Sequence, residues 1–437
     1  MTIRRDPLGF LTRMRAQYGD VTSHLLDERV YLVNRPELAH LVLAANRRNY
    51  VKAGTPDDIM LTPVLGEGLL TSEGEVWKRQ RRVSQPAFAR ERVEGFDTLI
   101  TSATDELVDR WTTAAPSAEP LRLDHQLSGL TLAIVARAVF GSDLTGINER
   151  FGEAVDVLNR FMGHFDPLED STAGRESRVA FSKAVGFLNG LVGLLIQARR
   201  LEGTEGRDDL LSRLIDGQRE DSSAGGPEAS SARGPERELR DQVVTMLMAG
   251  HETTAKALTW TLVLLHDHPA VAGRLHAELD AVLADRPARA ADLAQLPFCR
   301  QVVQESMRLY PPVWLLSRRA VEDAELGEFD VPVGTLVCVS PYVLHRDERF
   351  WEDPEAFDPD RFADERSAGR PDYAYIPFSG GPRHCIGRHF AMLEAQLVLA
   401  TILRRVRVGL VDGHPIEPEA LVTLRPRHGV LATVHTR

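Results

Sequence analysis

The chain has 437 residues, enough for one large domain or for two or three of ordinary size. Its three cysteines argue against a disulfide scaffold and suit a reducing cytoplasm. A formal net charge of −11 argues against nucleic acid as a partner. The most apolar stretches, 243–250 and 257–265, are shorter than the roughly 18 residues of a membrane span, and no apolar leader follows Met1. We therefore expect a soluble, cytoplasmic protein without a membrane span.

The N-terminal part of the chain predicts helices and one small hairpin. Hydrophobic spacing indicates helices over 7–18, 36–46 and 75–85, and β-branched residues indicate a hairpin over 21–33. Residues 52–74 mix Gly, Pro and Asp with apolar side chains, which predicts a long loop.

The helix predicted over 75–85 carries a basic cluster. Trp77 and Arg81 lie four residues apart on one helix face, where an indole N–H and a guanidinium can bind a carboxylate together. We interpret Lys78, Arg79 and Arg82 as a solvated basic face. On an acidic protein, such a patch is suited to docking an acidic electron donor.

The middle of the chain, 92–215, is again mostly helical in pattern and carries no recognisable chemistry. Residues 216–235 are rich in Ser, Gly, Ala and charge, which predicts a mobile loop. Helical sequence continues on both sides of this loop, so we treat residues 1–437 as a single domain.

Residues 236–266 predict a long buried helix that contains Ala249, Gly250, His251, Glu252, Thr253 and Thr254. Gly and Thr are poor helix formers, and a Thr hydroxyl can bond a backbone carbonyl and open the helix locally. A carboxylate beside hydroxyls in an apolar helix is costly unless something uses it. The alternative is that Thr253 and Thr254 merely bend a core helix and that Glu252 points at solvent. His251 lies on another face, and we interpret it as structural.

A shorter helix follows, with Glu305 and Arg308 at i and i+3, where they can pair. Alone, this pattern usually marks a surface salt bridge. Pro311 and Pro312 end the helix and force an extended chain toward Arg318. Further on, the residue pattern predicts short strands in two pairs, 331–334 with 336–339 and 421–424 with 430–434.

Cys385 lies in a bend formed by glycines and a proline over 378–387, directly before a helical run, 388–403. Glycines let the backbone approach a flat ligand closely, and a helix N-terminus stabilises a negative sulfur, so we expect a thiolate. A thiolate can serve as a nucleophile, a structural metal ligand or an axial haem ligand. Zinc is disfavoured because Cys299 and Cys338 are far away in sequence, but a nucleophile with a nearby histidine as base stays open at this point.

The loop sequence resembles a known family. Phe378, Gly381, Arg383, Cys385 and Gly387 match the Phe-x-x-Gly-x-Arg-x-Cys-x-Gly pattern of the cytochrome P450, or haem-thiolate monooxygenase, family. The absence of an apolar N-terminal anchor resembles the soluble bacterial members. The resemblance implies a mainly α fold with small β-sheets, in which a long central helix crosses over a haem and a Cys loop holds it. It extends over ordered motifs from Trp77 to Gly387.

The resemblance also implies roles for individual residues. Cys385 would be the proximal ligand of haem b, with Phe378 packed near the sulfur. The remaining cofactor contacts would be Trp77, Arg81, Arg318 (or its neighbour Arg319) and Arg383 at the haem propionates, together with Ala249, Gly250 and Gly387. Thr253 and Glu252 would be catalytic: the hydroxyl would bind reduced dioxygen, and the carboxylate would help deliver protons for O–O cleavage. Arg361 would join Glu305 and Arg308 in a buried structural cluster, since two cations sharing one carboxylate would fix the meander that carries the Cys loop.

The expected reaction is insertion of one oxygen atom of O2 into a C–H bond, as hydroxylation or epoxidation. The predicted substrate contacts are apolar, which favours a lipophilic molecule such as a terpenoid, polyketide or fatty acyl compound; they are Leu247, Val313, Leu315, Leu316 and Val422. The sequence has no flavin or iron–sulfur motif, so we expect electrons from a separate ferredoxin and its reductase. We also expect a monomer.

Three alternatives are weighed against this reading. A peroxide-driven haem-thiolate peroxygenase commonly lacks the acid–alcohol pair, so Glu252 and Thr253 count against it. A non-catalytic haem-binding sensor would need the thiolate but would show no substrate-dependent oxidation. A thiol hydrolase would hold no haem and would be colourless.

Overall fold

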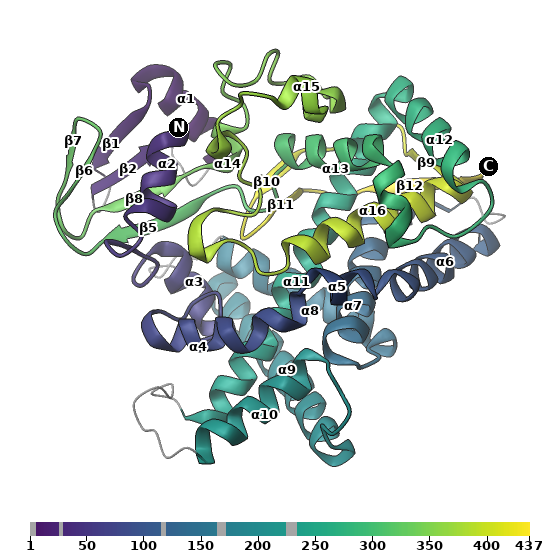
Figure 1. Ribbon diagram of the computed structural model, residues 1–437, viewed down its shortest axis with the longest axis horizontal. Coiled ribbons are helices and arrows are strands. Elements are labelled where there is room, and N and C mark those ends of the chain that lie inside the picture. The colour runs from purple at the N-terminus through teal and green to yellow at the C-terminus, as the bar shows by residue number, and fades with distance from the viewer. Residues whose placement is uncertain (1–5, 26–28, 115–118, 164–171, 224–233) are drawn as a thin grey trace.

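A computed structural model describes residues 6–25, 29–114, 119–163, 172–223 and 234–437. Helices dominate, and strands form small sheets that lie mostly at one side of the molecule, near the N-terminal helix (Figure 1). The predicted mainly α fold with small β-sheets is confirmed. The helices are α1 (Pro7–Tyr18), α2 (Pro36–His40), α3 (Pro56–Leu65), α4 (Gly74–Ser84), α5 (Arg90–Glu94), α6 (Asp97–Ala114), α7 (Leu123–Phe140), α8 (Asn148–Gly163), α9 (Thr172–Glu202), α10 (Leu210–Ser223), α11 (Pro235–Asp267), α12 (Pro269–Leu283), α13 (Pro297–Leu309), α14 (Pro341–Leu344), α15 (Asp364–Ser367) and α16 (Arg388–Arg405).

The largest sheet has the strand order β1-β2-β8-β5-β3, with β2 parallel to β8 and the other pairs antiparallel. Separate small sheets have the strand orders β4-β12-β9, β10-β11 and β6-β7. The strands are β1 (Val21–Leu25), β2 (Arg29–Val33), β3 (Tyr50–Val51), β4 (Leu121–Arg122), β5 (Leu316–Ala320), β6 (Ala324–Leu326), β7 (Phe329–Val331), β8 (Leu336–Val339), β9 (Val406–Leu410), β10 (Pro418–Ala420), β11 (Leu424–Pro426) and β12 (Leu431–Thr436).

Helix α11 is the central element, and the prediction over 236–266 is confirmed to within one residue at each end. Pro235 occupies its first turn, where a missing N–H costs nothing, and 33 residues give it a length of about 50 Å. Most of its side chains from Leu239 onward are buried, and it packs against α7, α9, α13 and α16. The helix runs through 249–254, and the Thr253 hydroxyl donates to the backbone carbonyl of Ala249 at 2.8 Å, the kind of contact expected there.

Four local predictions are wrong in part. Residues 52–74 contain α3, because the Thr55 hydroxyl caps the Asp58 N–H and Pro56 starts the helix. The predicted loop over 216–235 begins as the end of α10, where Asp216 accepts a hydrogen bond from Thr204, and residues 224–233 lie outside the described residues. Of the predicted strands, 336–339 matches β8, which enters the large sheet, and 430–434 overlaps β12, which pairs with β9 and β4. Residues 331–334 and 421–424 mostly lie in turns: only Val331 belongs to β7, which pairs with β6, and only Leu424 belongs to β11, which pairs with β10.

Helix α9 is long and apolar enough to cross a membrane by length and composition alone. Over Gly174–Glu202 its most apolar window has a mean hydropathy of 1.8, and 28% of that window is buried. Core helices of soluble proteins pass the same test, and α9 packs on α8 and α11. The expectation that no segment spans a membrane therefore stays a prediction.

Candidate active site

The Cys loop is held by its backbone. The N–H of Cys385 donates to the carbonyl of Phe378 at 2.9 Å, and Gly387 precedes the first turn of α16. Gly381 has φ +66°, and a Cβ there would lie 2.1 Å from the carbonyl oxygen of Leu43. Only glycine fits this position, because both the dihedral angle and the close approach exclude a side chain. The loop thus fixes the Cys385 side chain at the wall of a cavity.

Cys385 is exposed toward the cavity but surrounded by protein. Burial raises the pKa of its thiol, while the Gly387 N–H and the charges of Arg81 and Arg388 act in the opposite direction. Burial of the thiol and these opposing groups therefore act against one another, and the expectation of a thiolate at Cys385 stays a prediction. A metal cation bound at Sγ would deprotonate it.

The histidines near Cys385 do not serve as its base. His384 directs Nδ1 to the carbonyl of Gly381 at 2.8 Å and Nε2 to the guanidinium of Arg81 at 3.3 Å. His389 is exposed. A general base must lie within hydrogen-bond reach of the proton it takes, so the nucleophile reading loses its support.

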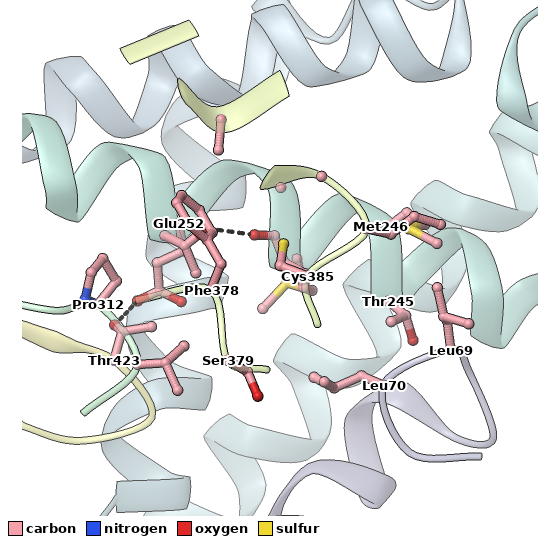
Figure 2. A pocket seen from close by; sticks show the side chains of 18 of the residues that line it. Leu69, Leu70, Thr245, Met246, Glu252, Pro312, Phe378, Ser379, Cys385 and Thr423 are labelled. Atoms are coloured by element: carbon pink, nitrogen blue, oxygen red, sulfur yellow. Dashed lines mark hydrogen bonds between the residues drawn. The ribbon is translucent and has the colours of Figure 1, made fainter. Parts of the chain in front are cut away.

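A cavity of about 360 Å³ extends from the Cys loop to α11. Its wall is mostly apolar and comes from α3, α4, α8, α11, residues 312–316 and the turn between β10 and β11. In Figure 2, Phe378, Ser379 and Cys385 lie near Glu252 and Met246 of α11, with Thr423 at one end of the cavity. The predicted site residues on this wall are Trp77, Arg81, Ala249, Gly250, Glu252, Thr253, Val313, Leu315, Leu316, Arg318, Phe378, Arg383, Cys385, Gly387 and Val422.

Leu247 is the predicted pocket residue that the structure places elsewhere. It is 1% exposed in the main core and does not line the cavity. Met246 lies seven residues before Thr253, almost two full turns, and so shares its face. Leu247 is rotated by about 100° from Met246 along the helix, which turns it into the core.

The acid and the hydroxyl of α11 both reach this cavity. Thr253 Oγ1 donates to the carbonyl of Ala249 at 2.8 Å. Glu252 is 5% exposed, and its Oε1 accepts hydrogen bonds from Asn159 Nδ2 at 2.6 Å and Thr423 Oγ1 at 2.8 Å. The alternative in which Glu252 points at solvent is wrong. His251 is fully buried against the ring of Phe151, and burial lowers its pKa to about 3, which agrees with a structural role.

Basic side chains gather at one part of the cavity wall. Burial and the charges of Arg318 and Arg383 lower the pKa of Lys52 to about 7. Burial and the charge of Arg383 likewise lower the pKa of Arg318 to about 10. Burial also raises the pKa of Asp57, so this carboxyl compensates the cations poorly. The cluster is short of negative charge, and an anion bound among these side chains would stabilise them.

The remaining predicted propionate contacts fit the same reading. Arg383 donates through Nη2 to the carbonyl of Ser72 at 2.7 Å and pairs with Glu73, while its buried Nη1 has no partner in the part of the chain that the structure describes. The ring of Trp77 lies 4.4 Å from the Arg383 guanidinium. Arg81 donates to the carbonyl of His384 at 3.0 Å. The unpaired guanidinium N–H of Arg383 suits a haem carboxylate, and the sulfur of Cys385 suits the haem iron.

The structure separates Arg318 from Arg319. Arg318 is 4% exposed and lines the cavity, whereas Arg319 donates to the carbonyls of Gly54 and Gly334 on the other side of strand β5. Successive side chains of a strand point to opposite faces, which explains why Arg318 reaches the cavity and Arg319 does not.

Glu305, Arg308 and Arg361 meet in the core beside the Cys loop. Arg308 donates through Nε and Nη2 to the two oxygens of Glu305 at 2.7 and 2.8 Å, and Arg361 Nε lies 3.4 Å from Glu305 Oε1. These side chains are 0%, 0% and 4% exposed, in the order Glu305, Arg308, Arg361.

The basic face predicted on α4 is smaller than expected. Arg82 is exposed and Lys78 pairs with Glu75, but Arg79 is largely buried and pairs with Glu238 of α11. The interpretation of Arg79 as solvated is wrong, because α11 begins next to α4.

The motifs do not include three polar residues of the cavity wall, Asn159, Thr245 and Thr423, which folding brings together from α8, α11 and the β10–β11 turn. Lys52 and Asp57, also on the wall, lie in the stretch 52–74, which the resemblance places over the haem, but no individual role was predicted for them. A buried Asn on an otherwise amphipathic helix was the one available signal, for Asn159.

The family model described as Cytochrome P450 matches residues 2–432. Cyclooctatin synthase of Streptomyces melanosporofaciens is 36% identical, covering 97% of this chain and 90% of that protein. Pentalenene oxygenase of Streptomyces avermitilis is 33% identical, covering 96% of this chain and 91% of that protein. Cyclooctat-9-en-7-ol 5-monooxygenase of Streptomyces melanosporofaciens is 34% identical, covering 94% of this chain and 87% of that protein.

Solved structures agree with the sequence comparisons. The crystal structure of the cytochrome P450DA heme domain superposes with a TM-score of 0.86 at 25% identity, covering 98% of this chain and 93% of that one. With its Cys loop, its acid–alcohol pair and a match over almost its whole length, this chain belongs to the cytochrome P450 family of haem-iron oxidoreductases.

Proposed function

We propose that this enzyme inserts one oxygen atom of O2 into a C–H bond, or across a C=C bond, of a lipophilic terpenoid, using electrons from an external ferredoxin and its reductase. The observation that carries the proposal is a mostly apolar cavity whose wall includes Cys385, Glu252 and Thr253. Relatives named for oxidation of pentalenene and of cyclooctat-9-en-7-ol favour a terpenoid over a polyketide or fatty acyl compound.

Haem b is the cofactor we propose for this cavity. Cys385 would bind the iron through Sγ, and Arg81, Arg318 and Arg383 would bind its carboxylates, which relieves the excess of buried positive charge. When bound, this group supplies the iron at which dioxygen is activated, with the thiolate donating electron density.

The side chains of the chain itself then bind, exclude water and move protons. The apolar wall holds the substrate and keeps water out of the reacting space. The Thr253 hydroxyl directs its hydrogen to Ala249, so its oxygen is available to accept a hydrogen bond in the cavity. Glu252 accepts both of its hydrogen bonds at Oε1, which leaves Oε2 available to take and release protons.

The electron donor would dock on the face that carries α4. Lys78 and Arg82 are exposed on α4, and the chain has an overall charge of −11, so these cations stand out as contacts for an acidic protein. We propose that the enzyme acts as a monomer in the cytoplasm.

Turnover tests this function directly. The purified haem-loaded enzyme, a ferredoxin and its reductase are incubated under ¹⁸O2 with pentalenene and with cyclooctat-9-en-7-ol, and the products are analysed by mass spectrometry. We expect a product that carries one ¹⁸O atom. The Thr253→Ala variant should still consume O2 but release more hydrogen peroxide and less product than wild type. Product formed with hydrogen peroxide alone at the same rate would contradict the proposal in favour of a peroxygenase, and no substrate-dependent oxidation would favour a sensor.

A further inference from the structure

Glu252 is held from two sides by side chains that no motif contains. Asn159 comes from α8 and Thr423 from the turn between β10 and β11, and both donate to the same oxygen, Oε1. Asn159 is 2% exposed, Thr423 5% and Glu252 5%, so water does not replace these hydrogen bonds readily. Hydrogen bonds to a charged group in such a place are stronger than those between neutral groups.

The arrangement leaves the second oxygen of Glu252 unoccupied. Within the described residues Oε2 accepts no hydrogen bond, and Glu252 lines the cavity. A Glu side chain has three rotatable bonds, so without the two donors its carboxyl would sample several directions. The donors fix one direction, in which Oε1 faces the protein and Oε2 is left for proton exchange.

The two donors belong to one connected wall. Arg425 of β11 lies 3.3 Å from Asp156 of α8, and a Cβ on Gly163 would lie 2.4 Å from the Leu421 side chain, so the end of α8 packs closely on the turn. Met162 and Val422, close neighbours of Asn159 and Thr423, line the cavity. A substrate that fills the cavity therefore contacts the same segments that hold Glu252.

We propose that Asn159 and Thr423 are positioning residues that aim Glu252 for proton delivery. The inference rests on the proposed oxygenase function and deepens it, because it adds two residues that act through Glu252. Loss of either donor should impair the use of protons even when the enzyme is saturated with substrate.

The first test compares Thr423→Val, which removes the hydroxyl at nearly equal volume, with Thr423→Ser, which keeps it. Product formed per O2 consumed should fall roughly tenfold in Thr423→Val, as expected for one lost hydrogen bond to a charged group, and stay within about twofold of wild type in Thr423→Ser. Asn159→Leu should behave like Thr423→Val and serves as the second variant if that protein does not fold. Because both residues line the cavity, substrate affinity is measured by spectral titration for all three variants, and product per O2 is compared at saturating substrate.

The second test asks whether the effect passes through Glu252. In a Glu252→Gln background, Thr423→Val should cause no further loss, because residues that act through one group are not additive. An equal further loss in that background, or an unchanged product yield in Thr423→Val, would overturn the proposal.

An infrared measurement on the resting protein separates this inference from the proposed function. The carboxyl band assigned to Glu252, by its disappearance in Glu252→Gln, should shift in Thr423→Val and return in Thr423→Ser. A shift in an enzyme that oxidises no terpenoid would support the positioning role while contradicting the proposed substrate. A band that does not respond to Thr423→Val would overturn the positioning role whatever the substrate.

Discussion

Replacing Glu305 by Gln tests the buried charge cluster of Glu305, Arg308 and Arg361, which we expect to support the Cys loop. The carboxylate of Glu305 accepts two hydrogen bonds from Arg308 and one from the N–H of Asp358 at 3.0 Å, and it faces Arg361 at 3.4 Å. An amide there would leave two guanidinium groups uncompensated in the core and turn a donor toward them. Breaking a buried pair from one side costs about 3–5 kcal/mol, and we expect a loss of that size in the free energy of unfolding.

The matched control is the same substitution in an exposed pair. Glu37 pairs with Arg35 at 3.0 Å, with side chains 60% and 53% exposed, so Glu37→Gln should cost less than about 1 kcal/mol. Equilibrium denaturation by urea measures both, and Trp351, which is stacked on the Arg308 guanidinium at 5.2 Å, reports locally by fluorescence. Equal and small losses in the two variants would refute the view that this cluster stabilises the fold around the Cys loop.

Three further predictions concern the loop, a buried acid and the cation cluster. Gly381→Ala should prevent the Cys loop from forming, because its Cβ would clash with the carbonyl of Leu43, and the fraction of protein with a thiolate-type carbon monoxide spectrum should fall to near zero. Burial holds the pKa of Glu394 well above its usual value, so the folded protein keeps this proton while the unfolded chain loses it above about pH 4.3. The resulting loss in the free energy of unfolding is absent below that pH and grows as pH rises. Glu394→Gln should therefore raise the urea midpoint at pH 8 but not at pH 4. Arg318→Ala should speed the loss of haem to apomyoglobin, while Arg319→Ala, on the opposite face of the strand, should not; equal rates would contradict the assignment of Arg318.

The sequence best predicted those elements whose boundaries are set by neighbouring residues. Proline, capping residues and apolar spacing place α1 and α11 almost to the residue. The Cys385 loop is recognisable because its glycines meet backbone constraints that no other residue satisfies, as Gly381 shows.

What the sequence failed to predict depends on long-range contacts. Residues 421–423 form the turn between β10 and β11 instead of a strand paired with 430–434, because β12 pairs with β9 and β4, and no local pattern records these long-range partners. The burial of Arg79 likewise depends on where α11 begins, and the thiol pKa of Cys385 depends on the burial of the loop as a whole. Asn159 and Thr423 lie 264 positions apart by number and meet only at Glu252.

The measurement that tests the central claim most directly is the absorption spectrum of the dithionite-reduced protein under carbon monoxide, with Cys385→Ala and Cys299→Ala beside wild type. Cys299 is buried and does not line the cavity, so its variant is a control for loss of a thiol. We predict a strongly red-shifted Soret band of the thiolate-ligated form in wild type and Cys299→Ala, and its loss in Cys385→Ala. A colourless protein, or a band of histidine-ligated type that survives Cys385→Ala, would contradict the account.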